Sequence, residues 1–168
     1  MKHFFFLFVA AVMLATFTGC FKGMDEQKCE YDPCRFKAPA TEVQALKDYL
    51  AANSITATEH CSGLFYAIQN PGTGKSPEPC SYVYATYKGM FTNGDVFDEA
   101  AEPLGFSLNR VVQGWTNGVP LVKEGGRIVL YIPPSLGYGS QDVRDQQGIV
   151  RIPGNSTLIF EVDLVAVQ

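Results

Sequence analysis

The chain has 168 residues and a net charge of −4, and 46% of its residues are apolar or aromatic. This length favours one domain with additional segments, and the apolar content is sufficient for a packed core. The net negative charge argues against nucleic acid as a partner. Beyond the N-terminus, no stretch approaches the ~20 apolar residues that a membrane-spanning helix needs.

The N-terminus has the three zones of an export signal. Lys2 precedes an apolar run over residues 4–17, and Thr18-Gly19-Cys20 follows. This predicts a signal peptide over residues 1–19 and resembles the bacterial lipoprotein cleavage box, in which Cys20 becomes the acylated first residue. The alternatives are an ordinary signal peptide with an incidental cysteine, or a short anchor helix. We therefore expect a lipid-anchored protein of the bacterial cell envelope, facing the periplasm or the cell surface.

Four cysteines remain once Cys20 is set aside: Cys29, Cys34, Cys61 and Cys80. Because an exported protein resides where disulfides persist, we expect two bridges, and the sequence leaves all three pairings open. Free thiols are an alternative. A metal site is least favoured, because the cysteine spacing lacks a tight second pair.

Residues 20–40 are polar and without periodicity, which predicts a tether. Residues 41–60 are predicted as a helix and linker. Thr41 and Gln44 match a capping box, and Val43, Leu46 and Leu50 form an apolar stripe. Such a helix either packs on its own domain or serves as a linker or a dimerisation arm, and the first is the simpler interpretation.

Residues 61–168 show strand patterns and are predicted as one domain. Asn93-Gly94 indicates a hairpin turn between a strand over residues 82–91 and a short strand ending at Asp98, followed by a loop over residues 99–105. Five apolar residues, 128–132, predict a strand buried on both faces, which ends at Pro133-Pro134. Residues 158–164 alternate as a closing strand does.

Six motifs occur in one order over residues 62–167. They are Tyr87-Lys88-Gly89, Gly94-Asp95-Val96-Phe97-Asp98, Val111-Val112-Gln113-Gly114-Trp115, Gly125-Gly126-Arg127, Ile132-Pro133-Pro134-Ser135-Leu136-Gly137-Tyr138-Gly139 and Ile152-Pro153-Gly154-Asn155-Ser156-Thr157-Leu158-Ile159-Phe160. This series resembles the FKBP-type peptidyl-prolyl cis-trans isomerases. The resemblance implies an α+β fold, with a twisted five-stranded antiparallel sheet wrapped on a short helix and, here, an N-terminal helical extension.

The resemblance also implies the activity and the site. Isomerisation of proline-containing unfolded or exported polypeptides would need an apolar pocket and no cofactor or metal. Asp98 and Tyr138 are the expected catalytic residues, with Tyr138 and the Val112 N–H donating to substrate carbonyls. The expected substrate-binding residues are Tyr87, Phe97, Leu104, Val111, Val112, Trp115, Ile152 and Phe160, with Trp115 as the floor. A macrolide is a further ligand that the family implies.

Several positions depart from the family pattern. Leu104 replaces an aromatic wall residue, which predicts a shallower pocket on that side. Gly137 and Gly154 replace an alanine and a proline, which predicts looser loops, and residues 142–150 form a longer, charged flap. These departures favour a second hypothesis, a binding module or chaperone without turnover. A third is a surface lipoprotein that serves adhesion or complex assembly.

Overall fold

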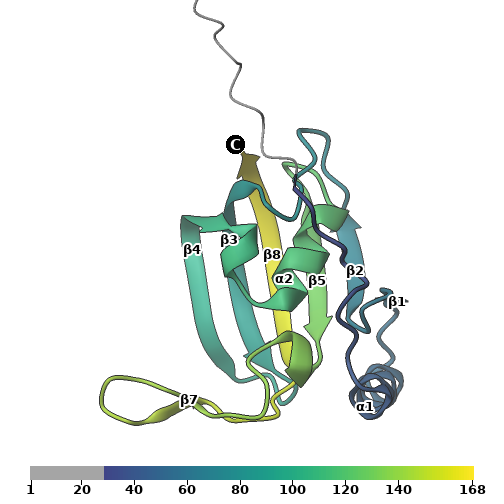
Figure 1. The fold of residues 1–168 in the computed structure, drawn as a ribbon, viewed down its shortest axis with the longest axis vertical. Helices are drawn as coiled ribbons and strands as arrows, with labels where there is room; N and C mark the ends of the chain where they lie inside the picture. The colour runs from purple at the N-terminus through teal and green to yellow at the C-terminus, as the bar shows by residue number, and fades with distance from the viewer. Residues whose placement is uncertain (1–28) are drawn as a thin grey trace, which may run out of the picture.

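The computed structural model describes residues 29–168. The expected signal peptide and Cys20 lie outside this range. The main sheet has six antiparallel strands in the order β1-β2-β5-β8-β3-β4 (Figure 1). The strands are β1 (Thr58–Glu59), β2 (Phe65–Asn70), β3 (Tyr82–Phe91), β4 (Val96–Ser107), β5 (Arg127–Ile132) and β8 (Leu158–Val167). The expected fold class is confirmed; β1 is a two-residue addition at the edge, ahead of the expected domain start at residue 61.

Strand β5 is the centre of the molecule and is buried on both faces, as predicted. Ile128, Leu130 and Ile132 point into the larger apolar cluster, on the face covered by helix α2 (Gln113–Gly118). Val129 and Tyr131 point the other way, into a smaller cluster that includes residues of helix α1 (Ala40–Ala52). This alternation follows from the two-residue period of a strand.

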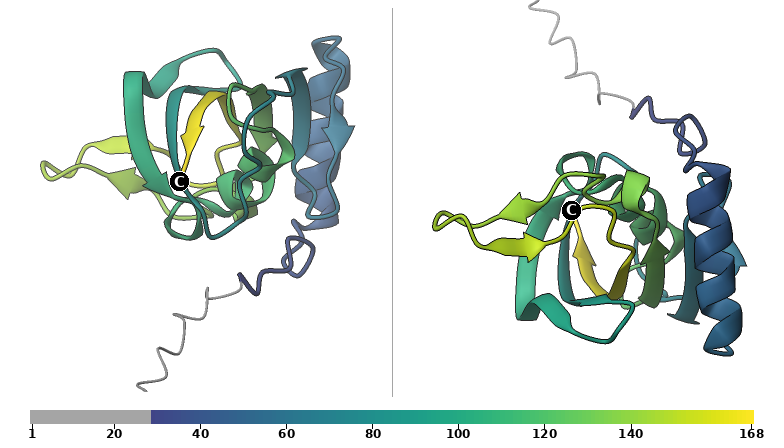
Figure 2. Two further views of the ribbon diagram at one scale, coloured as in Figure 1. Left: turned by 90° about the horizontal axis from the view of Figure 1, so that it is seen from above. Right: turned by 90° about the horizontal axis from the view of Figure 1, so that it is seen from below.

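Helix α1 packs on its own domain through Leu46 and Leu50, both buried. It lies along the outside of the sheet, beside β2 (Figure 2). The predicted capping box is wrong, because the helix begins at Ala40 after Pro39 and has no side-chain cap. The carbonyl of Pro39 accepts the first helical hydrogen bonds, and Gln44 instead donates to Asp48. A proline fixes φ near the helical value, which lets the helix start there without a polar cap.

Two disulfides join the N-terminal segment to the domain. Cys29 pairs with Cys80 and Cys34 with Cys61, across 51 and 27 residues of sequence. Between them, the hydroxyl of Tyr31 lies against side chains of α2. The segment expected as a tether is therefore fixed to the domain from residue 29 onward.

Strand β4 is much longer than predicted. The sequence places its end at Asp98, but pairing with β3 continues through Ser107. The register shifts between Ala85 and Tyr87 and accommodates extra residues of β4 there. Because β4 is an edge strand, its outer side needs no partner, so exposed polar residues and Pro103 are tolerated. The loop predicted over residues 99–105 is wrong for this reason.

The remaining elements are short. They are the single turns η1 (Leu108–Arg110), η2 (Val119–Leu121) and η3 (Pro134–Leu136) and the paired strands β6 (Val143–Arg144) and β7 (Val150–Ile152). The β6–β7 hairpin, which we call the flap, extends sideways past β4 (Figure 2). No helix within residues 29–168 has the length and apolar content required to cross a membrane.

Candidate active site

A cavity of about 520 Å³ opens between α2, η1 and the inner face of β3 and β4. Its walls are mostly aromatic or aliphatic. The lining residues are Tyr87, Asp98, Phe106, Arg110, Val111, Val112, Trp115, Tyr138 and Phe160. Such a concave, largely apolar site with a few polar groups is the usual form of a small-ligand pocket.

Trp115 is buried in this cavity, with 4% of its surface exposed. The ring centroids of Tyr87, Phe106 and Phe160 lie 5.3, 5.3 and 5.4 Å from its own, all in edge-on arrangements. Edge-on aromatic pairs are favourable beyond the area they bury. These contacts therefore hold the rings in the walls of the cavity, so that they do not fill it.

Two glycines explain why Trp115 lies so deep. A Cβ atom on Gly114 would lie 2.5 Å from Cδ1 of Ile132, and one on Gly118 would lie 2.5 Å from Cδ2 of Leu130. Only glycine allows α2 to contact β5 with its backbone at these points. Because α2 is pressed onto the sheet, the indole next to Gly114 forms the floor of the cavity.

Three polar side chains of the cavity, those of Tyr87, Asp98 and Tyr138, lie close together. The hydroxyl of Tyr87 donates to Oδ2 of Asp98 at 2.7 Å. Burial, that hydrogen bond, and the nearby charges of Asp98 and Tyr138 raise the pKa of Tyr87 well above its ordinary value. Burial and the charge of Asp98 also raise the pKa of Tyr138. Both phenols therefore remain protonated donors at neutral pH.

One backbone donor at the cavity is unused. Val112 immediately precedes α2, and its carbonyl accepts the N–H groups of Trp115 and Thr116. Its own N–H donates to no acceptor among the described residues. A ligand carbonyl at the cavity mouth could accept this hydrogen bond without displacing another.

Residues 74–165 match the sequence profile of the FKBP-type peptidyl-prolyl cis-trans isomerases. The chain belongs to this family. The FKBP-type isomerase FkpA of Buchnera aphidicola subsp. Baizongia pistaciae is 43% identical over 110 residues, which cover 64% of this chain and 41% of that protein. FkpA of Escherichia coli K12 is 41% identical over 110 residues, which cover 64% of this chain and 38% of that protein. The chain thus spans about two fifths of the length of these curated relatives.

Solved structures of the family resemble this FKBP-type domain. A peptidyl-prolyl cis-trans isomerase of Pseudomonas syringae superposes with a TM-score of 0.65 at 28% identity, covering 79% of this chain and 98% of that one. FkpA of Escherichia coli superposes with a TM-score of 0.65 at 36% identity, and the match covers 77% of this chain and 60% of that one. The similarity therefore extends from the motifs to the backbone that presents them.

Most of the residues predicted for the FKBP-type site meet at the cavity. Seven of them line it: Tyr87, Asp98, Val111, Val112, Trp115, Tyr138 and Phe160. Phe97 lies behind the lining, with its ring centroid 5.4 Å from that of Phe160. Ile152 is buried in the larger apolar cluster and is not part of the lining. Asp98 is an exposed residue although it lines the cavity.

The expectation for Leu104 is wrong. Its side chain is 48% exposed on edge strand β4 and does not line the cavity. Phe106, two residues further along, closes that side and contacts Trp115. The pocket is therefore not shallower there. The two-residue period of a strand could have suggested Phe106, but the register shift in β4 was not visible in the sequence.

Arg110 is the other lining residue that the motifs did not indicate. It is an exposed cation at the end of η1. An exposed arginine is unremarkable on any protein surface, so nothing in the sequence pattern marked it as part of a pocket. Only the turn of η1 toward α2 brings it to the cavity.

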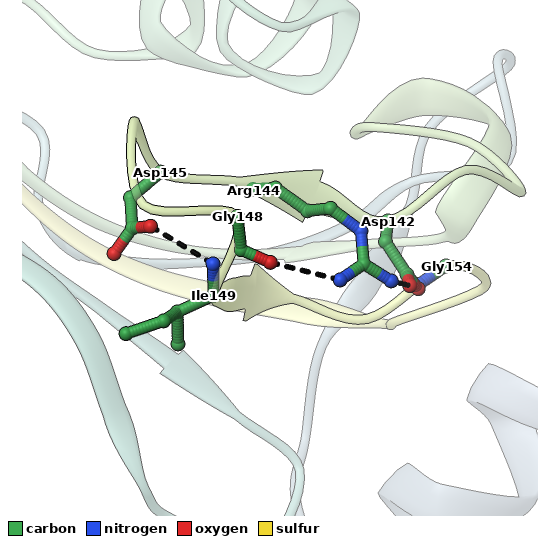
Figure 3. Close-up of polar contacts among 6 residues, drawn as sticks. All are labelled: Asp142, Arg144, Asp145, Gly148, Ile149 and Gly154. Atoms are coloured by element: carbon green, nitrogen blue, oxygen red, sulfur yellow. Dashed lines mark hydrogen bonds and ion pairs between the residues drawn. The ribbon is translucent and has the colours of Figure 1, made fainter.

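The loop that contains Gly154 is closely packed. A Cβ atom on Gly154 would lie 2.2 Å from the carbonyl oxygen of Ser140, so a close backbone contact requires glycine there. The N–H of Gly154 donates to Asp142, which also pairs with Arg144 (Figure 3). The expectation of a looser loop at this position is therefore wrong.

The flap is held by its own polar residues. Arg144 donates to the carbonyl of Gly148, and Asp145 accepts the N–H of Ile149 (Figure 3). Partial burial raises the pKa of Asp145, but the N–H groups of Ile149 and Gln147, together with Arg151, more than offset this. The pKa of the carboxyl consequently lies below its ordinary value, and the flap is a defined hairpin.

Proposed function

We propose that the protein is a peptidyl-prolyl cis-trans isomerase that acts on proline-containing segments of unfolded or exported polypeptides. The observation that carries this proposal is the aromatic cavity of about 520 Å³ floored by Trp115. Its size and apolar walls suit a prolyl ring. Its few polar groups suit the amide next to that ring.

The chemistry required of the site is modest. Rotation about an Xaa-Pro bond crosses a barrier of ~18 to 20 kcal/mol, which arises from the resonance that keeps the amide planar. The twisted transition state has lost that resonance and is less dipolar than the planar amide. An apolar cavity that excludes water and holds the twisted conformer stabilises it relative to the ground state.

The polar residues would orient the substrate. In this proposal Tyr138 and the N–H of Val112 donate to substrate carbonyls, and Asp98 acts as a positioning residue. The 2.7 Å hydrogen bond from Tyr87 to Asp98 supports that role, because it fixes the phenol that forms one wall. The raised pKa of Tyr138 supports its role as a donor at neutral pH.

The test is a proline-peptide isomerisation assay with the full-length protein. The wild type is expected to accelerate isomerisation, and a Trp115→Ala, Tyr138→Phe double variant is expected to lose most of that acceleration. Tyr66→Phe is the matched control, since it removes a phenol hydroxyl outside the cavity lining. Equal rates for the wild type and a folded double variant would refute the proposal, and retained peptide binding without turnover would favour a binding module. The same assay with a macrolide added tests that ligand class.

We also propose that the protein is exported and anchored by lipid through Cys20. The apolar run followed by Thr18-Gly19-Cys20 supports this location. The two disulfides support it further, because such bonds persist in oxidising compartments. A fatty-acid analogue fed to the cells is expected to label the wild type and not Cys20→Ala. Labelling that survives the substitution would overturn the anchor.

A further inference from the structure

Arg110 adds a positive charge to the residues that line this pocket. The residue ends η1, is exposed, and is one of the residues that line the cavity. It also lies two residues before Val112, whose unused N–H faces a ligand in the proposed binding mode. A substrate residue next to the prolyl ring therefore passes close to a guanidinium group.

The charge of Arg110 is not neutralised within the described part of the chain. The cavity lining contains one other charged residue, Asp98, and no ion pair within 4.0 Å joins its carboxylate to Arg110. None of the ion pairs among residues 29–168 includes Arg110. By contrast, both arginines of the flap, Arg144 and Arg151, are paired with aspartates. Arg110 is thus the cation available to a ligand.

We propose that Arg110 is a specificity-determining residue, which makes the pocket prefer prolyl segments that carry a carboxylate side chain within one or two residues of the proline. The inference rests on the proposed isomerase function and adds a substrate class to it. A planar guanidinium binds a carboxylate through two parallel hydrogen bonds, which suits this pairing. The chain as a whole has a net charge of −4, so a preference for acidic segments cannot come from its overall charge.

The expected size of the preference follows from the exposure of the residue. Exposed ion pairs measured in proteins correspond to a change of about 1.4- to 5-fold in an equilibrium constant. We expect kcat/KM for a peptide with Glu near the proline to exceed that of the matched Gln peptide by this factor. A Lys peptide should fall below the Gln peptide. The differences should shrink in about 1 M salt, where the screening length is ~3 Å.

The experiment compares peptides that differ at one position with proteins that differ at one residue. Glu, Gln or Lys is placed in turn at each of the two positions before and after a single proline. Each peptide is assayed with the wild type, Arg110→Gln and Arg110→Glu. Lys75→Glu is the control, because it makes the same charge change at an exposed residue outside the cavity lining.

The preference for Glu is expected at one or more positions, absent in Arg110→Gln, reversed toward Lys in Arg110→Glu, and kept in Lys75→Glu. If Arg110 had a purely structural role, its substitution would change kcat/KM equally for all peptides and would not reverse the preference. Equal rates for Glu, Gln and Lys peptides at every position would overturn the inference while leaving the isomerase proposal intact. A wild type that accelerates no peptide at all would overturn the isomerase proposal itself.

Discussion

Both faces of strand β5 pack into apolar clusters, but a long helix covers one face and a short helix covers the other. On one face, Leu46 and Leu50 of the 13-residue helix α1 pack against Phe65, Tyr131 and their neighbours, and that cluster is closed. On the other face, α2 has only six residues and leaves the aromatic rings around Trp115 lining an open cavity.

The difference shows how a pocket is built from ordinary core residues. A long helix covers its side of the sheet, whereas a short one held against β5 by glycines leaves the inner face of β3 and β4 uncovered. Rigid aromatic rings in edge-on contact then keep the space open. The closed face supports stability, and the open face is free to serve binding.

The largest effect is expected on the closed face. Leu46 is 1% exposed, and Leu46→Ala should lower the free energy of unfolding by about 2 to 5 kcal/mol, because the lost side chain leaves a void. Isomerisation by the protein that remains folded should not change. Denaturant unfolding and the peptide assay measure the two quantities. A loss of activity in fully folded Leu46→Ala would show that the two faces are not independent.

A smaller effect on stability is expected from forcing α2 away from the sheet. Gly114→Ala places a Cβ atom 2.5 Å from the side chain of Ile132, and overpacking of this kind costs about 1 to 3 kcal/mol. The shift should also move Trp115 and lower kcat/KM. Thermal unfolding, together with Trp115 fluorescence, tests both parts. An unchanged emission spectrum with unchanged activity would contradict the role of this close contact.

Tyr138→Phe should affect the open face alone. Tyr138 is 45% exposed and its hydroxyl donates no hydrogen bond among the described residues, so the free energy of unfolding should be nearly unaffected. Loss of one hydrogen bond of about 0.5 to 1.5 kcal/mol to the substrate should lower kcat/KM by about two- to twelvefold. Full activity in the variant would remove Tyr138 from the mechanism.

The flap should respond to acid without global unfolding. The pKa of Asp145 lies below its ordinary value of 3.8, so its contribution to stability is present above that value and is lost as the pH falls through the folded pKa. The amide signal of Ile149, followed by NMR, should therefore change with a midpoint below pH 3.8. A midpoint at or above 3.8 would contradict this, and Asp145→Asn should abolish the transition.

The smallest effect is expected at Leu104. Because the side chain is 48% exposed and lies outside the cavity, Leu104→Ala should change stability by no more than about 0.5 kcal/mol and leave kcat/KM unaltered. Phe106→Ala is the matched comparison, since that ring contacts Trp115, and it should lower activity. Equal losses of kcat/KM in both variants would show that Leu104 does contribute to the site.

Much of the fold could be predicted because local patterns agreed with the family motifs. The run over residues 128–132 and the alternation of β8 follow directly from burial, and both match the structure. Strand β4 could not be recognised, because an edge strand tolerates polar residues and a proline that usually indicate a loop. The disulfide pairing also could not be predicted from the sequence, because it depends on which distant segments the fold brings together.

The site was predictable where a motif carried it. Trp115, Tyr87 and Tyr138 occupy motif positions and line the cavity together. Phe106 and Arg110 lie between motifs, and their places depend on the register of β4 and on the turn of η1. The spacing of residues in the sequence predicts neither the register of β4 nor the turn of η1.

The central claim is that a prolyl ring enters the cavity over Trp115 and that its amide rotates there. NMR exchange spectroscopy of a peptide with one proline, in the presence of the protein, tests this most directly. We predict cis-trans exchange cross-peaks that are absent for the peptide alone, with Overhauser effects between the proline ring and the Trp115 indole. Accelerated exchange in which the proline ring contacts another part of the surface and not Trp115 would contradict the account.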